Sequence, residues 1–173
     1  SDTLQINIDI TFHKLPCNIL SVDIQDIVGT HSYNHEGELI KYSIDKANRI
    51  LGTVTNNKKE KKAENNLNNN DNNYNEIKRA LATEEGCQIK GSVSVLRVPG
   101  SLQISSHYFA EMIIKLSQEG LYDFNLAHTV NHISFGDEKD LKKIKEIFNT
   151  GILNPIDGIR KNNVSKKKTI FEY

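Results

Sequence analysis

Two blocks of alternating apolar and polar residues, each associated with one of the two cysteines of the chain, most constrain the fold. The first block covers residues 4–12 and leads to Cys17, and the second runs from Cys87 to residue 105. Alternation with period two places one face of each strand on a core and the other face in water. A cysteine at an equivalent place in each block suggests one disulfide between two packed sheets, in an oxidising compartment. Two buried free thiols in a reducing compartment remain the alternative.

Length and charge narrow the class of protein. A chain of 173 residues suits a single domain with a real core. Basic and acidic residues number 22 each, so the neutral chain has no general attraction to nucleic acid, and we predict no such partner. No apolar run is long enough to cross a bilayer, and Ser1 leads almost directly into a strand pattern. We therefore expect any targeting and anchoring segments to lie outside this sequence.

The periodicity along the chain predicts a mainly β, antiparallel sandwich-like domain over residues 1–173, with two or three short helices. Strands are predicted at 4–12, 19–28, 39–45, 87–105 with a break at Pro99-Gly100, 123–135 and 169–173. Helices are predicted at 75–83, 107–118 and 137–149. The last of these strands looks cut off at its start.

Residues 56–75 differ in composition from the rest of the chain. Half of them are Asn, and most of the others are charged. Such a stretch cannot bury enough apolar surface to offset the entropy lost on ordering. We predict a disordered surface insertion here.

Motifs that carry chemistry are few. His128 and His132 have the HxxxH spacing of a zinc site on a helix, but here the spacing falls on a predicted strand without a third ligand nearby, so we predict no metal. Asp23 and Asp26 could form a catalytic pair, although polar surface positions are the simpler interpretation. No nucleophile elbow, P-loop or dinucleotide fingerprint occurs, so we predict no catalytic residue and no cofactor.

Eight short strings occur in the order in which one family has them. They are Ile6-Asn-Ile-Asp-Ile-Thr-Phe12, Pro16-Cys17, Leu20-Ser-Val-Asp23, Gly86-Cys-Gln-Ile-Lys-Gly91, Arg97-Val-Pro-Gly100, Phe124-Asn-Leu-Ala-His128, His132-Ile-Ser-Phe-Gly136 and Asn154-Pro-Ile-Asp-Gly158. Together they resemble the lumenal domain of the endoplasmic reticulum vesicle proteins, also called the endoplasmic reticulum–Golgi intermediate compartment family. The resemblance covers residues 1–45 and 86–158.

The resemblance implies a location and a set of partners. Members of this family are membrane proteins with a transmembrane helix on each side of a β-rich lumenal domain. They cycle in COPII and COPI vesicles between endoplasmic reticulum and Golgi, assemble with related subunits and act as cargo receptors. The resemblance therefore implies that this domain binds cargo and a sister subunit and does not catalyse a reaction. Coat proteins would contact only segments outside this chain. A scaffold that only assembles with its sister subunit remains an alternative.

The chain departs from the family pattern in three ways. The family's lumenal domain usually continues with more strands past Phe171-Glu-Tyr173, so the resemblance implies that this domain is truncated at its C-terminal end. The Asn-rich tract stands where one branch carries a cysteine cluster, so a role for such a cluster does not apply. The helix at 137–149 is an insertion that looks more like the branch fused to a thioredoxin-like, protein-disulfide-isomerase module. The alternative function is therefore the C-terminal binding domain of a membrane-anchored disulfide isomerase, with its CxxC motif outside this chain.

The resemblance also bears on individual residues. It favours a disulfide between Cys17 and Cys87, which would stabilise the fold by about 4 kcal/mol in the chain-entropy model. Asn163 begins an Asn-Val-Ser sequon, which is meaningful only in the lumen. His128 and His132 become candidates for pH sensing, because histidines titrate near pH 6.5 and can report acidification between endoplasmic reticulum and Golgi.

Overall fold

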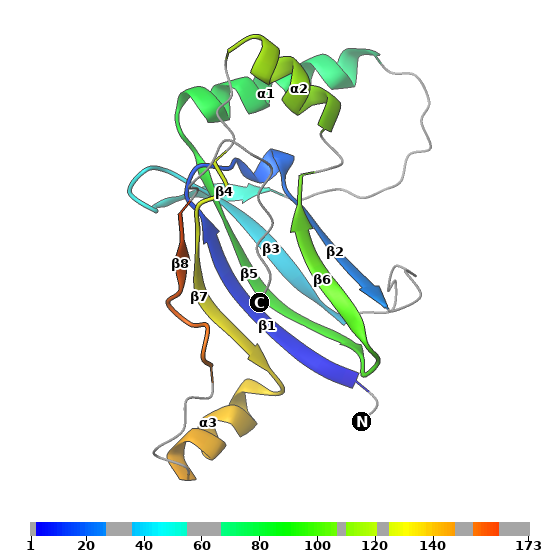
Figure 1. Ribbon diagram of the computed structural model, residues 1–173, viewed down its shortest axis with the longest axis vertical. Helices are drawn as coiled ribbons and strands as arrows, with labels where there is room; N and C mark the ends of the chain where they lie inside the picture. The colour runs from blue at the N-terminus through cyan, green and yellow to red at the C-terminus, as the bar shows by residue number, and fades with distance from the viewer. Residues whose placement is uncertain are drawn as a thin grey trace.

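A computed structural model of the chain describes residues 3–26, 36–54, 67–106, 110–120, 125–147 and 154–162 (Figure 1). Its main element is a six-stranded antiparallel sheet with the strand order β4-β3-β5-β1-β7-β8. These strands are β1 (Thr3–Phe12), β3 (Glu36–Ile44), β4 (Ile50–Val54), β5 (Gly86–Leu96), β7 (His128–Phe135) and β8 (Arg160–Lys161). A second sheet pairs β2 (Ser21–Asp26) with β6 (Gly100–Ser105). The predicted fold class, mainly antiparallel β with a few helices, is confirmed.

Three α-helices and one short 3-10 helix accompany the sheets. They are α1 (Leu67–Ala82), α2 (Ala110–Gln118), α3 (Glu138–Ile147) and η1 (Cys17–Ile19). Helices α1 and α2 lie together beyond one end of the large sheet, whereas α3 projects from the opposite end (Figure 1). The helices predicted at 107–118 and 137–149 thus correspond to α2 and α3.

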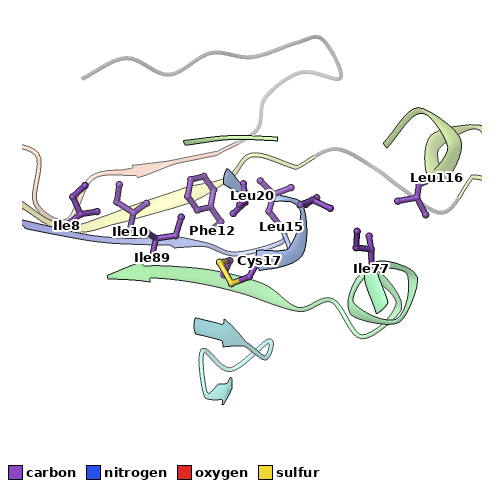
Figure 2. Close-up of a cluster of buried hydrophobic side chains, with 11 residues drawn as sticks. Ile8, Ile10, Phe12, Leu15, Cys17, Leu20, Ile77, Ile89 and Leu116 are labelled. Carbon is purple, nitrogen blue, oxygen red and sulfur yellow. A yellow bond between two sulfur atoms is a disulfide. The ribbon is translucent and has the colours of Figure 1, made fainter. Parts of the chain in front are cut away.

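The hydrophobic core lies on one face of the large sheet. Ile8, Ile10 and Phe12 of β1 and Ile89 of β5 form its sheet side, because alternate residues of each strand point to the same face (Figure 2). The small sheet packs against it through Val22, Leu102 and Ile104, and η1 contributes Leu15 from its approach together with Ile19 and Leu20. Ile77 of α1 and Leu116 of α2 extend the cluster beyond the end of the sheet.

The strand predicted at 87–105 divides between the two sheets. Its first part is β5, the central partner of β1 and β3, and its second part is β6, which pairs only with β2 among the described residues. The backbone turns where the N–H of Val98 donates to the oxygen of Leu96 at 2.8 Å, directly before Pro99. Proline has no N–H for a sheet ladder, so the chain leaves the first sheet there.

Part of the Asn-rich tract is helical, so the prediction of disorder over 56–75 is wrong for residues 67–75, which form the first turns of α1. The reason lies in the apolar side of that helix, where Tyr74, Ile77 and Leu81 pack on the core. Once a helix is nucleated by such packing, each further Asn costs less than about 0.7 kcal/mol relative to Ala. Residues 55–66 and the strand predicted at 169–173 lie outside the described residues.

The disulfide joins different elements from those predicted. Cys17 and Cys87 are bonded and both are buried, but Cys17 lies in η1, the link between the two sheets, and Cys87 lies in β5. The bond therefore ties the link to the large sheet, and the prediction that it connects two packed sheets is wrong. The alternation of the first block ends at Phe12, before the chain reaches the cysteine.

Candidate binding surface

The face of the large sheet opposite the core is lined by polar side chains; we call it the polar face. Along β1 it carries the residues that alternate with the core isoleucines, namely Gln5, Asn7, Asp9 and Thr11. Strands β5 and β7 flank β1 on both sides in antiparallel register and place further amides and hydroxyls beside these residues. Because three central strands contribute, the polar face is a continuous surface and not a single row.

Asp9 is the centre of a hydrogen-bond network across these three strands. Its Oδ1 accepts from Gln88 Nε2 and from Asn131 Nδ2, each at 2.8 Å, and its Oδ2 lies 3.7 Å from Lys90 Nζ. Asn131 Nδ2 also donates to Thr11 Oγ1 at 2.8 Å. We call the set Asp9, Thr11, Gln88 and Asn131 the Asp9 network. Mutual hydrogen bonds of this kind hold the side chains in one orientation.

A β-bulge in β7 brings Asn131 into the network. Asp9 pairs with His132 and the next residue of β1, Ile10, pairs with Val130, so Asn131 is an extra residue without an opposite partner. The bulge reverses the alternation of β7 beyond this point. His132 consequently shares the polar face with Asp9, whereas Val130 stays on the core side.

The same bulge separates the two histidines singled out from the sequence. His128 is buried on the core side, where its ring centroid lies 5.4 Å from that of Phe12. His132 is half-buried on the polar face, with its Nδ1 2.7 Å from Asp157 Oδ2. Two residues four apart on a regular strand would share a face, so a bulge is what prevents their convergence. Among the described residues, no cluster of three or more His, Cys, Asp or Glu side chains could hold a metal ion.

Three further residues were considered from the sequence, namely Asp23, Asp26 and Asn163. Asn163 is outside the described residues. Asp23 is buried in β2 opposite Gln103, and Asp26 is opposite Gly100 at the end of the same strand. Residues three apart on a strand point to opposite faces, so these two carboxylates do not form a pair.

His13 lies at the end of the polar face, directly after β1. Its backbone N–H donates to the oxygen of Ala127 at 3.2 Å, and its Nε2 is 2.8 Å from Thr129 Oγ1. Burial lowers the pKa of the imidazole below its ordinary value, and the charges of Arg160 and His128 lower it further. The neutral form of His13 is therefore favoured in the folded chain.

Two adjoining hollows open around His13. The first, of about 360 Å³, we call the cationic hollow; it is lined by His13, Lys14, Lys46, Asn48, Glu84 and Arg160. The second, of about 400 Å³, we call the polar hollow; it is lined by the Asp9 network together with His13, Ile44, Asn48 and Thr129. Because His13 and Asn48 line both, the hollows form one site, with basic side chains in one part and hydrogen-bonding side chains around the Asp9 carboxylate in the other.

The cationic hollow carries more positive than negative charge. Lys46 forms an exposed salt bridge with Glu84, and the hydrogen bond and charge of Lys46, with a smaller contribution from Lys14, lower the pKa of that carboxyl group. Arg160 and Lys14 have no salt bridge within the described ranges. One carboxylate thus faces three cations, which makes this hollow a candidate site for an anion.

Asp9, His13 and Arg160 belong to no catalytic or metal-binding motif that the sequence shows. The signal available for Asp9 was the unusual content of the outward positions of β1, where amide and hydroxyl side chains replace the usual lysines and glutamates. No pattern in the sequence brings His13 and Arg160 together, because β8 reaches this place through its pairing with β7.

None of the helices in the described part of the chain combines the length and the apolar character needed to cross a membrane.

Comparison with known families decides which family the chain represents. The family model described as "Endoplasmic reticulum vesicle transporter" matches residues 50–173. The chain belongs to this family. A second model, "Endoplasmic Reticulum-Golgi Intermediate Compartment (ERGIC)", matches residues 1–33, so the two matches follow one another along the chain. The resemblance drawn from the eight short strings is confirmed.

Curated relatives carry names from the same compartment. The chain is 24% identical over 217 residues to "Probable endoplasmic reticulum-Golgi intermediate compartment protein 3" of Dictyostelium discoideum, with 94% of this chain and 54% of the relative covered. It is 22% identical over 146 residues to "Endoplasmic reticulum-Golgi intermediate compartment protein 1" of Xenopus laevis, with 84% and 35% covered. The chain therefore spans about half, or less, of the length of these relatives. Among solved structures, the crystal structure of Erv41p is similar, with 24% identity, a TM-score of 0.46, and 95% of this chain and 66% of that chain covered.

Proposed function

We propose that this chain is the lumenal domain of a membrane protein that cycles between endoplasmic reticulum and Golgi in coated vesicles. In this proposal the protein acts as a cargo receptor or sorting subunit, and the domain binds without catalysing a reaction. The observation that carries the proposal is the match of the vesicle-transporter model to residues 50–173. The names of the curated relatives support it.

The disulfide supports the lumenal location, because such bonds persist in oxidising compartments and are rare in the cytosol. Treatment with an alkylating reagent, first of the native protein and then in denaturant without reductant, tests whether the two cysteines are paired. We expect neither Cys17 nor Cys87 to be labelled, and two labelled thiols would contradict the proposal. Glycosylation of Asn163 provides a second test: glycosidase treatment should increase gel mobility of the wild-type protein and leave Asn163→Gln unchanged.

We place cargo binding on the polar face, around the two hollows. This surface offers oriented hydrogen-bonding groups from three strands and lies opposite the core that the small sheet covers. Peptides that add to a sheet edge are recognised through main-chain hydrogen bonds, whereas on a sheet face the hydrogen-bonding groups are side chains such as these. The related family subunit would bind a different part of the domain, and coat proteins would contact only segments outside this chain.

A vesicle-budding experiment tests the transport role. The full-length protein, carrying an epitope tag, is expressed in cells, and vesicles are formed from their endoplasmic reticulum membranes with purified coat proteins. We expect the tagged protein in the vesicles, and a cleavable crosslinker should capture a sister subunit and soluble lumenal proteins. Capture of the sister subunit alone would favour the scaffold, and absence from the vesicles would overturn the proposal.

A role in pH sensing is also proposed, and the two histidines are unequal candidates. His132 is 33% exposed and faces Asp157 on the polar face, so its protonation would strengthen that contact. His128 is buried, and protonation there would place a charge in the core beside Phe12. Cargo capture is compared at the pH of endoplasmic reticulum and of Golgi for wild type and for His128→Gln/His132→Gln. The same response in both proteins would contradict the proposal.

Helix α3 supports a second candidate function, the binding domain of a membrane-anchored disulfide isomerase. It is the insertion between β7 and the turn at 154–158 that resembles that branch. Determining the coding sequence on both sides of the chain separates the two. A thioredoxin-like domain with a CxxC motif upstream would make this chain the binding module of an anchored oxidoreductase. Apolar runs of about 20 residues on both sides without such a domain would support the vesicle receptor.

A further inference from the structure

We propose that the two hollows around His13 form a binding site for an acidic peptide segment, in which the cationic hollow holds a carboxylate and the polar hollow holds the neighbouring peptide backbone. This inference rests on the proposed function, since it names the class of cargo segment that the polar face would bind. It assigns a ligand to residues that the family match does not distinguish.

Arg160 is the main carboxylate-binding group of this proposal. Its position is set by the pairing of β8 with β7, which places it opposite Thr129, the residue that contacts His13. Its guanidinium is exposed and lines the cationic hollow without a salt bridge to any described residue. A guanidinium presents N–H groups in a planar fork that matches a carboxylate with two parallel hydrogen bonds.

The other charges of the hollow favour the same ligand. Lys14 is exposed and adds a second positive charge, whereas Lys46 is already paired with Glu84. Salt bridges between exposed groups are weak, so the Lys46–Glu84 pair does not prevent rearrangement around a ligand. An entering carboxylate would therefore balance the charge of Arg160 and Lys14.

The polar hollow offers groups that complement a peptide backbone. Asn131 uses its Nδ2 group for Asp9 and Thr11, which leaves its side-chain oxygen as an acceptor for a peptide N–H. Gln88 donates one hydrogen bond to Asp9, so a second amide hydrogen and its oxygen remain for a peptide C=O and N–H. Asn48 lines both hollows and so lies between the two parts of the site.

The hydrogen bonds within the Asp9 network distinguish this site from a simple cationic patch. A patch of surface lysines attracts any anion, with no preference for what the anion is attached to. Here the amides next to the cationic hollow are already oriented by Asp9, so a ligand that carries both a carboxylate and peptide groups gains contacts in both hollows. A free anion would fill only one of them.

Binding of short labelled peptides to the 173-residue chain tests the proposal. The probe is a fluorescein-labelled peptide of alternating Glu and Gly, and its matched control has Gln in place of Glu. Fluorescence anisotropy should show saturable binding of the Glu peptide and at least about tenfold weaker binding of the Gln peptide, the difference expected when a charged hydrogen bond is lost. Equal binding of the two, or no binding of the Glu peptide, would overturn the proposal.

Variants connect the binding to the two hollows. We expect Arg160→Gln to weaken Glu-peptide binding about tenfold, and Asn131→Ala to weaken both peptides to a similar extent. Lys139→Gln, an exposed lysine of α3, is the matched control and should bind like wild type. Thermal melting by circular dichroism checks that every variant is folded. Unchanged binding in folded Arg160→Gln would contradict the proposal.

Two further measurements separate the possible failures. Inorganic phosphate should displace the Glu peptide only weakly, and displacement as strong as that by unlabelled peptide would reduce the site to a general anion site and overturn the inference. In the budding experiment, full-length Arg160→Gln should enter vesicles normally but capture less cargo. If the protein enters vesicles but binds the Glu and Gln peptides equally, only the acidic-peptide site is contradicted. If the protein never enters vesicles, the proposed function itself is contradicted.

Discussion

The ammonium group of Lys41 lies 3.1 Å from the backbone oxygen of Cys17, the residue that forms the disulfide with Cys87. The same ammonium donates to the backbone oxygen of Leu20 at 2.8 Å. Lys41 is only 5% exposed and belongs to β3, the strand next to β5. A buried cation and a disulfide thus hold η1 to two neighbouring strands of the large sheet, at the point where the chain passes to the small sheet.

We expect Lys41→Met to lower the free energy of unfolding by about 1–3 kcal/mol, because the Leu20 oxygen loses this donor and the Cys17 oxygen is left with the N–H of Leu20 at 3.2 Å, while the apolar stem is kept. Urea denaturation followed by circular dichroism measures the change. Lys142→Met, at an exposed position of α3, is the matched control and should stay within about 0.5 kcal/mol of wild type. Equal stability of the two variants would show that the Lys41 contacts contribute nothing.

Reduction of the disulfide should lower the free energy of unfolding by about 4 kcal/mol, since the bond closes a long loop between residues that are 70 apart. Denaturation with and without dithiothreitol measures this difference in the wild-type protein. In Cys17→Ala/Cys87→Ala the reductant should have no effect. A wild-type curve that does not respond to reductant would contradict the bond.

Gly91 should not tolerate a side chain. A Cβ at this position would overlap the backbone oxygen of Glu38 on β3, and the φ of +150° is one that other residues rarely adopt. We expect Gly91→Ala to cost about 2 kcal/mol or more in the free energy of unfolding.

The matched control is Gly52 of β4, where an added Cβ has nothing within 4 Å. Gly52→Ala should leave the free energy of unfolding unchanged or raise it by about 0.5 kcal/mol, because alanine restricts the unfolded chain. Melting both variants side by side measures the difference. Similar melting temperatures would indicate that β3 and β5 can separate to admit the methyl group.

His13 should titrate below 6.5, its ordinary value, because burial and the charges of Arg160 and His128 oppose protonation. In the folded chain the lowered pKa contributes stability above pH 6.5, and this contribution is lost as the pH falls through the folded pKa, since the unfolded chain binds the proton first. Nuclear magnetic resonance of the imidazole follows the titration. We expect Arg160→Gln to raise the midpoint and Lys139→Gln to leave it in place; the same midpoint in all three proteins would rule out an effect of Arg160.

Local patterns were enough to predict the family and most of the strands, but not β4 or β8. The alternation from Leu4 to Phe12 predicted β1 almost to the residue, because one face of that strand packs on the core and the other carries polar side chains. The spacing of Leu141, Ile144 and Ile147 likewise predicted α3. In β1 the period records the packing of one face on the core. In α3 the pattern predicted the helix, although Ile144 and Ile147 are 40% and 73% exposed.

The candidate site depends on contacts between segments that are far apart in the chain. Such contacts leave no periodic pattern in the sequence. Asn131 reaches Asp9 through a bulge, and Arg160 reaches His13 through a two-residue strand at the edge of the sheet. Neither feature has a local signal, because a bulge arises from the fit of two strands and β8 is too short to show alternation. The same reasoning explains His128 and His132: their spacing is local, but the face on which each lies was decided by the register of β7 against β1.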